Sequence, residues 1–267
     1  MKIIIPMSGL GSRFVAAGYK DPKPLIKVHN KPIIEWVIKM LPDDVGEKNE
    51  FIFICRKEHV ENTNIVAELE RIRPDAKIIA IENHKRGPVY AVSLVFNEIK
   101  NDEPILISYC DYYMHWNFLD FKKAVLQKNI DGAVPCYTGF HPHLIPQKNL
   151  YAGCFVDDKK FLLEIREKFS FEKDKSKGFN SPGAYFFKNG EILKKYFQMA
   201  LDEDLSLNNE YYVSLVYQLM LRDKLNILVH DKIDYFCQWG TPEDLQEYLF
   251  WVAQIKNWSN ATNNKML

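Results

Sequence analysis

The sequence has no excess charge of either sign, because 35 Lys and Arg residues balance 35 Asp and Glu residues. This balance argues against nucleic acid or an anionic membrane as the main partner, since both attract a strongly basic surface. No stretch approaches the roughly 20 apolar residues that span a bilayer. The opening MKIIIPM has too short an apolar run for a secretory signal. We therefore expect a cytoplasmic protein that binds neither nucleic acid nor membrane.

Cysteine is sparse, and the five cysteines form no Cys-x-x-Cys pair, which disfavours both a zinc site and a disulfide framework. We expect buried, reduced thiols at Cys55, Cys110, Cys136, Cys154 and Cys237. His141 and His143 have a spacing that suits a metal on a strand, but no third ligand is identifiable. That pair therefore favours an ordinary loop.

The two best-known phosphate loops are also absent. The stretch PMSGLGSRFV follows an apolar strand and carries Gly9 and Gly11, but Phe14 stands where a Rossmann fingerprint needs its third glycine. A P-loop needs Gly-Lys-Ser/Thr, which this stretch lacks. A strand that ends in small residues still frees backbone N–H groups for an anion. Taken alone, the stretch is either a phosphate site or a plain tight turn.

The sequence contains many regular apolar runs, and 47% of the 267 residues are hydrophobic. Continuous strand-like runs at 2–7, 50–55, 76–81, 104–110 and 131–137 are separated by helical patterns at 31–41, 64–73, 87–99 and 119–129. Such runs indicate a doubly wound α/β fold with a mixed, mostly parallel sheet that is covered on both faces.

After about residue 150 the pattern becomes α+β, with short strands, two helices at 191–204 and 209–223, a strand at 226–239 and a helix at 241–255 that Thr241 caps. No Pro/Gly/Ser linker divides the chain. We expect one domain over 1–256, with a nucleotide-binding half at 1–135, an acceptor-binding half at 136–256 and a frayed tail at 257–267.

Two cations follow the first strand. Arg13 comes directly after the glycine turn, and Pro22 and Pro24 rigidly flank Lys23. Both would lie where a triphosphate could bind. With GLGSRF followed by PKPLI, the sequence resembles the sugar-phosphate nucleotidyltransferase (NTP-transferase) family, including its surface-polysaccharide members.

The resemblance extends to about residue 250 through motifs in the family's order, and it implies a Rossmann-like, GT-A-like fold. These motifs are HKRGPVYAV, LISYCDYYM, SFEKDKSKGFNSPGAYFF, NEYYVSLVYQLM and QWGTPEDL. The resemblance implies that Asp111 holds Mg²⁺ and that Glu172, Lys173 and Glu210 face the acceptor. It implies a nucleotide site at Met7, Ser8, Gly9, Gly11, Ser12, Arg13 and Gly87.

The implied reaction is attack of an acceptor phosphate oxygen on the α-phosphorus of a nucleoside triphosphate, with release of pyrophosphate. The enzyme's task is then to position and neutralise two polyanions. Arg13 would hold the β- and γ-phosphates, Lys23 the α-phosphate, and Lys173 the acceptor's phosphate. The resemblance also implies a sugar 1-phosphate acceptor and a surface-polysaccharide pathway.

One position departs from the family pattern. Many members place a second metal-binding carboxylate where this sequence has Gln238. Either Asp111 carries the metal with substrate oxygens and water, or Asp234 substitutes, or catalysis has been lost. We expect the first.

Each residue also has a plain structural explanation. Asp111 could end a strand, Lys23 could be a solvated loop charge, and Glu210 could serve a helix dipole. Glu172 and Lys173 lie in a charge-rich run that is typical of a solvated face. His84, His115 and Trp116 have no identifiable partner, and the rings of YYMHWNF favour core packing over an acceptor wall.

Alternative functions stay open. One is a cytidylyltransferase acting on a non-sugar phosphate such as phosphocholine, and another is a nucleotide-binding module without catalysis. A glycosyltransferase would normally show Asp-x-Asp, which CDYYMHW lacks. The nucleotide base and the oligomeric state are open as well, although the aromatic helix at 241–255 could form an interface between two copies.

Overall fold

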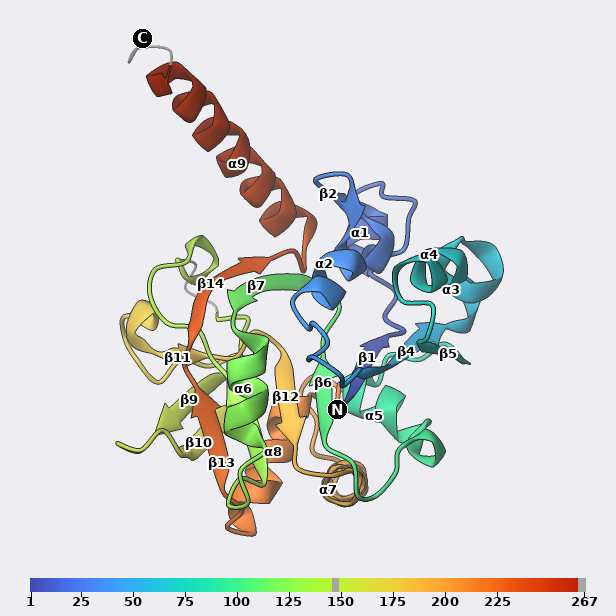
Figure 1. The fold of residues 1–267 in the computed structure, drawn as a ribbon, viewed down its shortest axis with the longest axis vertical. Helices are drawn as coiled ribbons and strands as arrows, with labels where there is room; N and C mark the ends of the chain where they lie inside the picture. The colour runs from blue at the N-terminus through green and yellow to red at the C-terminus, as the bar shows by residue number, and fades with distance from the viewer. Residues whose placement is uncertain (146–148, 264–267) are drawn as a thin grey trace.

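The computed structural model describes residues 1–145 and 149–263, and its centre is a seven-stranded sheet in the order β13-β8-β12-β6-β1-β4-β5 (Figure 1). Its strands are β1 (Lys2–Met7), β4 (Glu50–Arg56), β5 (Lys77–Ile81), β6 (Ile105–Ser108), β8 (Gly132–Pro135), β12 (Ala184–Phe187) and β13 (Ile227–His230). All neighbours pair in parallel except those of β12, which is antiparallel to β6 and β8. The predicted mixed, mostly parallel sheet is confirmed.

Helices cover both faces of this sheet, which explains why its strands are apolar without alternation. Along β1, Ile3 and Ile5 belong to one buried cluster and Ile4 to the other. The first cluster includes residues of α2 (Ile33–Lys39), α4 (Ile65–Ile72) and α6 (Phe118–Val125). The second includes residues of α5 (Gly87–Ser93), α7 (Gly190–Asp202) and α8 (Val213–Arg222). α3 (Lys57–Asn62) follows β4 directly.

The second half of the chain adds two smaller sheets. One consists of β10 (Leu162–Arg166), β9 (Gly153–Val156) and β11 (Phe179–Asn180). The other pairs β7 (Tyr112–Trp116) with β14 (Ile233–Gln238), so the strand predicted over 226–239 is two strands in two sheets. β7 was not predicted as a strand, because its aromatic residues gave no alternation. Tyr112 and Met114 of β7 are fully buried, and the burial of the Tyr112 ring agrees with the core packing favoured for the aromatic residues of this segment.

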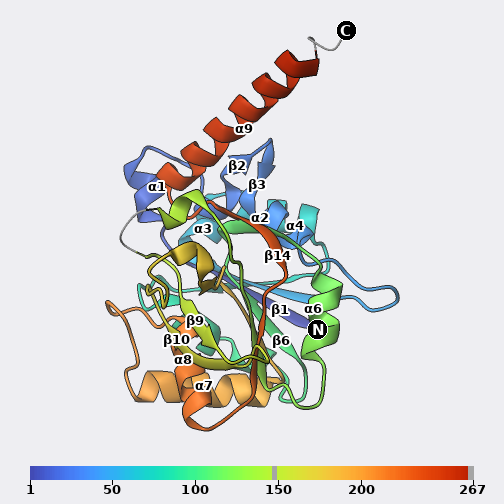
Figure 2. The same cartoon turned by 90° about the vertical axis from the view of Figure 1, so that its left-hand side faces the viewer.

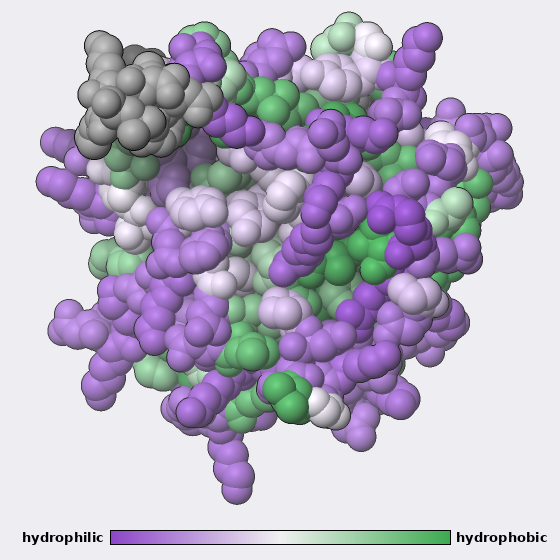
Figure 3. Space-filling view, turned by 45° about the horizontal axis from the view of Figure 1, so that its top comes forward, coloured by the Kyte–Doolittle hydropathy of each residue, from purple (hydrophilic) through white to green (hydrophobic). Residues whose placement is uncertain are grey.

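Short elements complete the chain. They are α1 (Ser12–Ala16), β2 (Lys27–Val28), β3 (Lys31–Pro32) and the 3-10 turns at Lys23–Leu25, Phe96–Glu98, Pro142–Leu144 and Lys175–Lys177. On the face in Figure 3, hydrophilic side chains predominate and the hydrophobic ones form smaller patches between them.

The last helix, α9 (Pro242–Asn263), projects away from the body of the protein (Figures 1 and 2). Thr241 caps it as predicted, because its Oγ1 accepts a hydrogen bond from the backbone N–H of Asp244 at 3.1 Å. The helix continues to Asn263 through the predicted frayed tail, and residues 264–267 lie outside the described part. Within that part, no helix is long and apolar enough to cross a membrane.

Candidate active site

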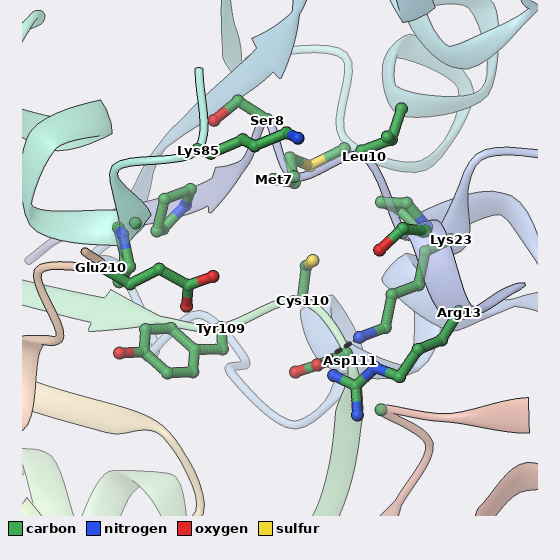
Figure 4. Close-up of a pocket in the computed structure, with 18 of the residues that line it drawn as sticks. Met7, Ser8, Leu10, Arg13, Lys23, Lys85, Tyr109, Cys110, Asp111 and Glu210 are labelled. Carbon is green, nitrogen blue, oxygen red and sulfur yellow. Dashed lines mark hydrogen bonds and ion pairs between the residues drawn. The ribbon is translucent and has the colours of Figure 1, made fainter. Parts of the chain in front are cut away.

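A cavity of about 460 Å³ opens beyond the carboxyl ends of β1 and β6, where open α/β sheets usually bind ligands. Its walls come from the turn after β1, the Lys23 loop, the 84–88 turn, the end of β6, the 210–212 segment and Gly240 (Figure 4). The predicted residues on its lining are Met7, Ser8, Gly9, Gly11, Ser12, Arg13, Lys23, Gly87, Asp111 and Glu210. The structure therefore brings together residues from four segments far apart in the chain.

The glycine turn forms one wall. Gly11 adopts φ 65°, and a Cβ there would stand 3.3 Å from the Cβ of Lys23, so a side chain would strain the turn and crowd the lysine loop. The backbone N–H groups of Phe14 and Val15 donate to the Gly11 carbonyl and start α1. Phe14 is buried and packs edge-on against Tyr19, which explains why this loop carries an aromatic where a Rossmann loop carries glycine.

Lys23 and Asp111 form an ion pair at one side of the cavity, with 2.5 Å between Nζ and Oδ2 (Figure 4). The Lys23 side chain is 15% exposed and that of Asp111 is 27% exposed, so both reach the cavity from largely buried positions. The Arg13 guanidinium lies beside this pair (Figure 4). Two cations and one carboxylate thus converge at one point, an arrangement that can bind phosphate groups and a divalent cation.

The carboxyl end of β14 contacts the backbone at Asp111 and Tyr112. The backbone N–H of Trp239 donates to the Asp111 carbonyl at 3.1 Å, and Gln238 pairs with Tyr112, the next residue after Asp111. A Cβ on Gly240 would stand 2.3 Å from the Gln238 amide nitrogen and 3.3 Å from Asp111 Oδ2. A larger residue here would displace the Gln238 amide, which lies close to the Asp111 carboxylate.

Asp244, in the first turn of α9, is a second carboxylate at this end. Burial raises the pKa of Asp244, while hydrogen bonds from Thr241 and Gln238 and the charge of Arg13 lower it. Its proximity to Gln238 and Arg13 follows from the tight turn at residues 239–241, which sequence spacing does not reveal.

Asp234, the suggested substitute ligand, is not brought to Asp111. It lies four residues before Gln238 on β14, roughly 13 Å along the strand. Its carboxylate instead contacts His115 Nδ1 at 2.7 Å. The geometry therefore contradicts a shared metal site for Asp111 and Asp234. Trp116, the other residue without a predicted partner, donates from Nε1 to the Met40 carbonyl at 2.8 Å.

His84 connects the 84–88 turn to the glycine turn. Its Nδ1 accepts from the backbone N–H of Arg86 at 3.2 Å, which leaves the proton on Nε2 to donate to Ser8 Oγ at 3.1 Å. Burial and the charges of Arg56 and Arg86 lower the pKa of His84 and keep the ring neutral. His84 thus orients the Ser8 hydroxyl at the cavity wall.

The acceptor end differs from the prediction. Glu210 points its carboxylate into the cavity beside Tyr109 (Figure 4). Glu172 and Lys173 are exposed on the loop before Lys175–Lys177, and the lining found among the described residues does not include them. Their charge-rich surroundings are the solvated face that was the alternative interpretation.

A different Glu-Lys pair, Glu167 and Lys168, contacts the segment that follows Glu210 and was not identified from the sequence. Lys168 Nζ donates to the Tyr212 hydroxyl at 2.9 Å, and that hydroxyl donates to Glu210 Oε2 at 2.5 Å. Burial raises the pKa of Glu167, and Ser214 Oγ donates to its carboxylate at 2.5 Å. Glu167 and Lys168 directly follow β10. This position could have indicated them as site residues, because a strand end fixes side chains better than the following loop does.

The remaining candidates do not form a metal site. His143 Nε2 and the Tyr137 hydroxyl are hydrogen-bonded at 2.9 Å, and burial lowers the pKa of His143 to about 3. In the described part of the chain, no group of three or more His, Cys, Asp or Glu residues is arranged to hold a metal ion.

The cysteines are free thiols, as predicted, although Cys110 and Cys237 are only half-buried. Cys110 lines the cavity, and burial raises its pKa to about 12. This thiol is therefore protonated at neutral pH and is a poor nucleophile.

Comparison with known proteins gives a family match and a shared fold. The family described as "MobA-like NTP transferase domain" matches residues 3–155. The chain is 26% identical over 236 residues to the bifunctional protein GlmU of Thermosipho africanus (strain TCF52B), which covers 88% of this chain and 46% of GlmU. The chain therefore spans about half the length of the curated relatives that it matches.

Solved structures share the whole fold at low sequence identity. The nucleoside-diphosphate-sugar pyrophosphorylase of Vibrio cholerae RC9 superposes with a TM-score of 0.74 and 19% identity over 92% of this chain and 99% of the other. The inositol-1-phosphate CTP transferase of T. maritima superposes with a TM-score of 0.66 and 16% identity over 91% and 90%. At these identities the likeness establishes the architecture alone.

Proposed function

The chain belongs to the MobA-like NTP transferase domain family, and we propose that it transfers a nucleoside monophosphate from a nucleoside triphosphate to a phosphorylated small molecule, releasing pyrophosphate. The observation that carries this proposal is the convergence of Arg13, Lys23 and Asp111 in one cavity, although the first and last are separated by about a hundred residues. The relatives named as pyrophosphorylase and CTP transferase have the same architecture.

The cations have separate tasks in this proposal. Arg13, at the end of the glycine turn, neutralises the β- and γ-phosphates that leave as pyrophosphate. Lys23 is fixed by its two flanking prolines and stabilises the negative charge that builds up on the α-phosphate oxygens. Its bond to Asp111 keeps the ammonium group in place before substrate arrives.

The oxygen donors around Asp111 fit a magnesium ion. Mg²⁺ commonly takes one or two protein carboxylates and completes its coordination with water and substrate phosphates. Asp111 is the carboxylate beside Lys23 and Arg13, the Gln238 amide lies close to it, and Asp244 is hydrogen-bonded to Gln238. When bound, Mg²⁺ would supply charge neutralisation and a template for the phosphate oxygens.

The acceptor binds at the opposite end of the cavity, beside Glu210, Tyr109 and Tyr212. A carboxylate with phenol hydroxyls suits the hydroxyl groups of a sugar 1-phosphate, which we favour as the acceptor. Lys168, whose Nζ donates to the Tyr212 hydroxyl, is a cation at this end of the cavity, and it replaces Lys173 as the candidate for the acceptor phosphate.

The same residues support a second acceptor class. Two tyrosine rings beside a carboxylate also form a site for a quaternary ammonium group, as in phosphocholine. Within the sugar 1-phosphate proposal, the product would be a cytoplasmic sugar nucleotide for a surface polysaccharide, a placement that rests on the family resemblance.

A grid assay tests the reaction and separates the acceptors. Pyrophosphate release is measured with Mg²⁺ for CTP, UTP, dTTP, GTP and ATP against sugar 1-phosphates, phosphocholine and inositol 1-phosphate. We expect release with one nucleotide and one acceptor class. Nucleotide binding without any release, under both Mg²⁺ and Mn²⁺, would contradict transfer and support a binding module.

A further inference from the structure

Two segments that are far apart in sequence join at the edge of the cavity. The backbone N–H of Tyr211 donates to the Arg86 carbonyl at 2.9 Å, and the backbone N–H of Val89 donates to the Tyr211 carbonyl at 3.1 Å. The segment 207–212, here called the acceptor loop, is therefore bonded through its main chain to the 84–88 turn at the start of α5.

Gly87 makes this close approach sterically allowed. It adopts φ 82°, and a Cβ there would stand 2.9 Å from the Tyr211 nitrogen and 3.0 Å from the Tyr211 oxygen. Any other residue would push the two backbones apart and would be strained by the dihedral angle itself. The glycine that was expected to face the nucleotide thus also faces the acceptor loop.

Arg86 strengthens the junction with its side chain. The guanidinium carbon lies 4.1 Å from the centre of the Tyr90 ring and 5.2 Å from that of Tyr211. Its Nη2 donates to the Tyr211 hydroxyl at 3.4 Å, and that hydroxyl also bonds to Asp204. Tyr211 is 6% exposed, so its ring is held on all sides.

The acceptor loop is stiff for a second reason. Leu207 and Glu210 exchange two backbone hydrogen bonds, at 3.0 and 3.1 Å, around a two-residue turn. Asn208 and Asn209 occupy this turn at φ 54° and 62°, the left-handed conformation that asparagine tolerates best after glycine. Glu210 therefore leaves a fixed turn next to Tyr211, and the Tyr212 hydroxyl, which donates to the Glu210 carboxylate, sets the direction of that carboxylate.

The residues on either side of Tyr211 face the cavity. Glu210 and Tyr212 line it, whereas the described lining does not include Arg86 or Tyr211. The junction therefore positions Glu210 and Tyr212, which line the cavity. The side chains of Arg86 and Tyr211, which form the junction, are not part of the described lining.

We propose that Arg86 and Tyr211 are positioning residues that couple the 84–88 turn to the acceptor loop. A nucleotide bound at the 84–88 turn fixes the acceptor loop, and so places Glu210 and Tyr212 for the acceptor. This inference rests on the proposed function, since it assigns the nucleotide to the first segment and the acceptor to the second.

Steady-state kinetics of Arg86→Ala and Tyr211→Phe test the coupling. We expect the KM for the acceptor at saturating nucleotide to rise at least fivefold in each variant. The dissociation constant of the nucleotide without acceptor should change less than twofold and kcat less than threefold, because coupling between two sites acts only when both are occupied. The double variant should be no worse than the more affected single variant, because both substitutions break one junction. Arg71→Ala, an exposed ion-paired arginine on α4, serves as the control and should change none of these values. An equal rise in the nucleotide dissociation constant, or no rise in the acceptor KM, would overturn the proposal.

Amide hydrogen exchange provides a readout that does not require turnover. In the unliganded protein, Arg86→Ala should speed exchange in both 87–92 and 207–213, and faster exchange in only one segment would contradict the junction. In the wild type, the nucleotide that raises the Tm with Mg²⁺ should slow exchange in 207–213, and Arg86→Ala should remove that protection. Bound nucleotide without slower exchange there would overturn the coupling, whereas no binding of any nucleotide would contradict the proposed function instead.

Discussion

The two ends of the cavity differ in how their residues are built into the fold. At the nucleotide end, Gly11, Arg13 and Lys23 belong to short local motifs whose geometry is set by glycine and proline. At the acceptor end, Glu210 is held by contacts with the distant 84–88 turn, and the predicted pair Glu172 and Lys173 lies outside the described lining. The nucleotide end can therefore be predicted from local sequence motifs, whereas the acceptor end depends on long-range packing.

The largest expected effect lies at the nucleotide end. Lys23→Ala or Asp111→Asn should each lower kcat by about a thousandfold or more, because these groups neutralise charge that builds up in the transition state. Pyrophosphate release measures the rate, and circular dichroism checks the fold. Lys20→Ala, an exposed lysine three residues away, is the control and should retain its activity. Near-normal rates in both cavity variants would contradict the assignment.

A smaller effect is expected at the acceptor end. Glu210→Gln should raise the acceptor KM about tenfold, because it removes a charged hydrogen-bond acceptor of roughly 1.5–3 kcal/mol from the cavity wall. Glu172→Gln and Lys173→Ala should each stay within twofold of the wild type. A larger loss in Glu172→Gln than in Glu210→Gln would restore the sequence-based assignment and refute the structural one.

Asp244 and Asp234 should differ in their effect on the metal. Asp244→Asn should raise the Mg²⁺ concentration for half-maximal activity several-fold, because it removes a buried charge next to Gln238 and Arg13. Asp234→Asn, whose carboxylate contacts His115 instead, should leave that concentration unchanged. Magnesium titrations of pyrophosphate release compare the two variants, and the opposite ranking would place the metal elsewhere.

The smallest expected effect concerns stability in the acceptor half. Burial lowers the pKa of His143 to about 3, so the unfolded chain takes up a proton near pH 6.5 that the folded chain refuses. Stability present above pH 6.5 should fall as the pH drops toward 3, by up to about 1.4 kcal/mol per pH unit from this residue. Urea unfolding at pH 7.5 and 5.5 measures the loss, and His143→Gln should reduce it. An unchanged pH dependence in that variant would show that the ring is not buried in its neutral form.

Much of the fold was predictable because its signals are local. The central strands are uninterrupted apolar runs, and the helices between them have clear periodicity, so the mixed, mostly parallel sheet followed directly. β7 was the exception, because its aromatic residues satisfy a strand, a helix or a core equally well, and only its pairing with β14 decides between these states. β14 was predicted as a strand, but as one strand with β13.

Site residues were predictable to the same degree. Arg13, Lys23 and Asp111 follow strands or rigid turns, and local sequence signals mark these positions. Asp244, Glu167 and the partner of His84 could not be found, because each depends on a contact across more than 40 residues or on a tight turn. A charge-rich loop such as 170–177 offers many equivalent Glu and Lys residues, and packing alone selects among them.

The most direct test of nucleotidyl transfer follows a radioactive label on one phosphate group of the nucleotide. The nucleotide that is active in the grid is supplied with ³²P at either the α or the γ position, and the acceptor product is isolated. The proposed reaction predicts that α label appears in the product and γ label leaves as pyrophosphate. Transfer of γ label to the acceptor, or release of label without a new acceptor product, would contradict nucleotidyl transfer at Lys23 and Asp111.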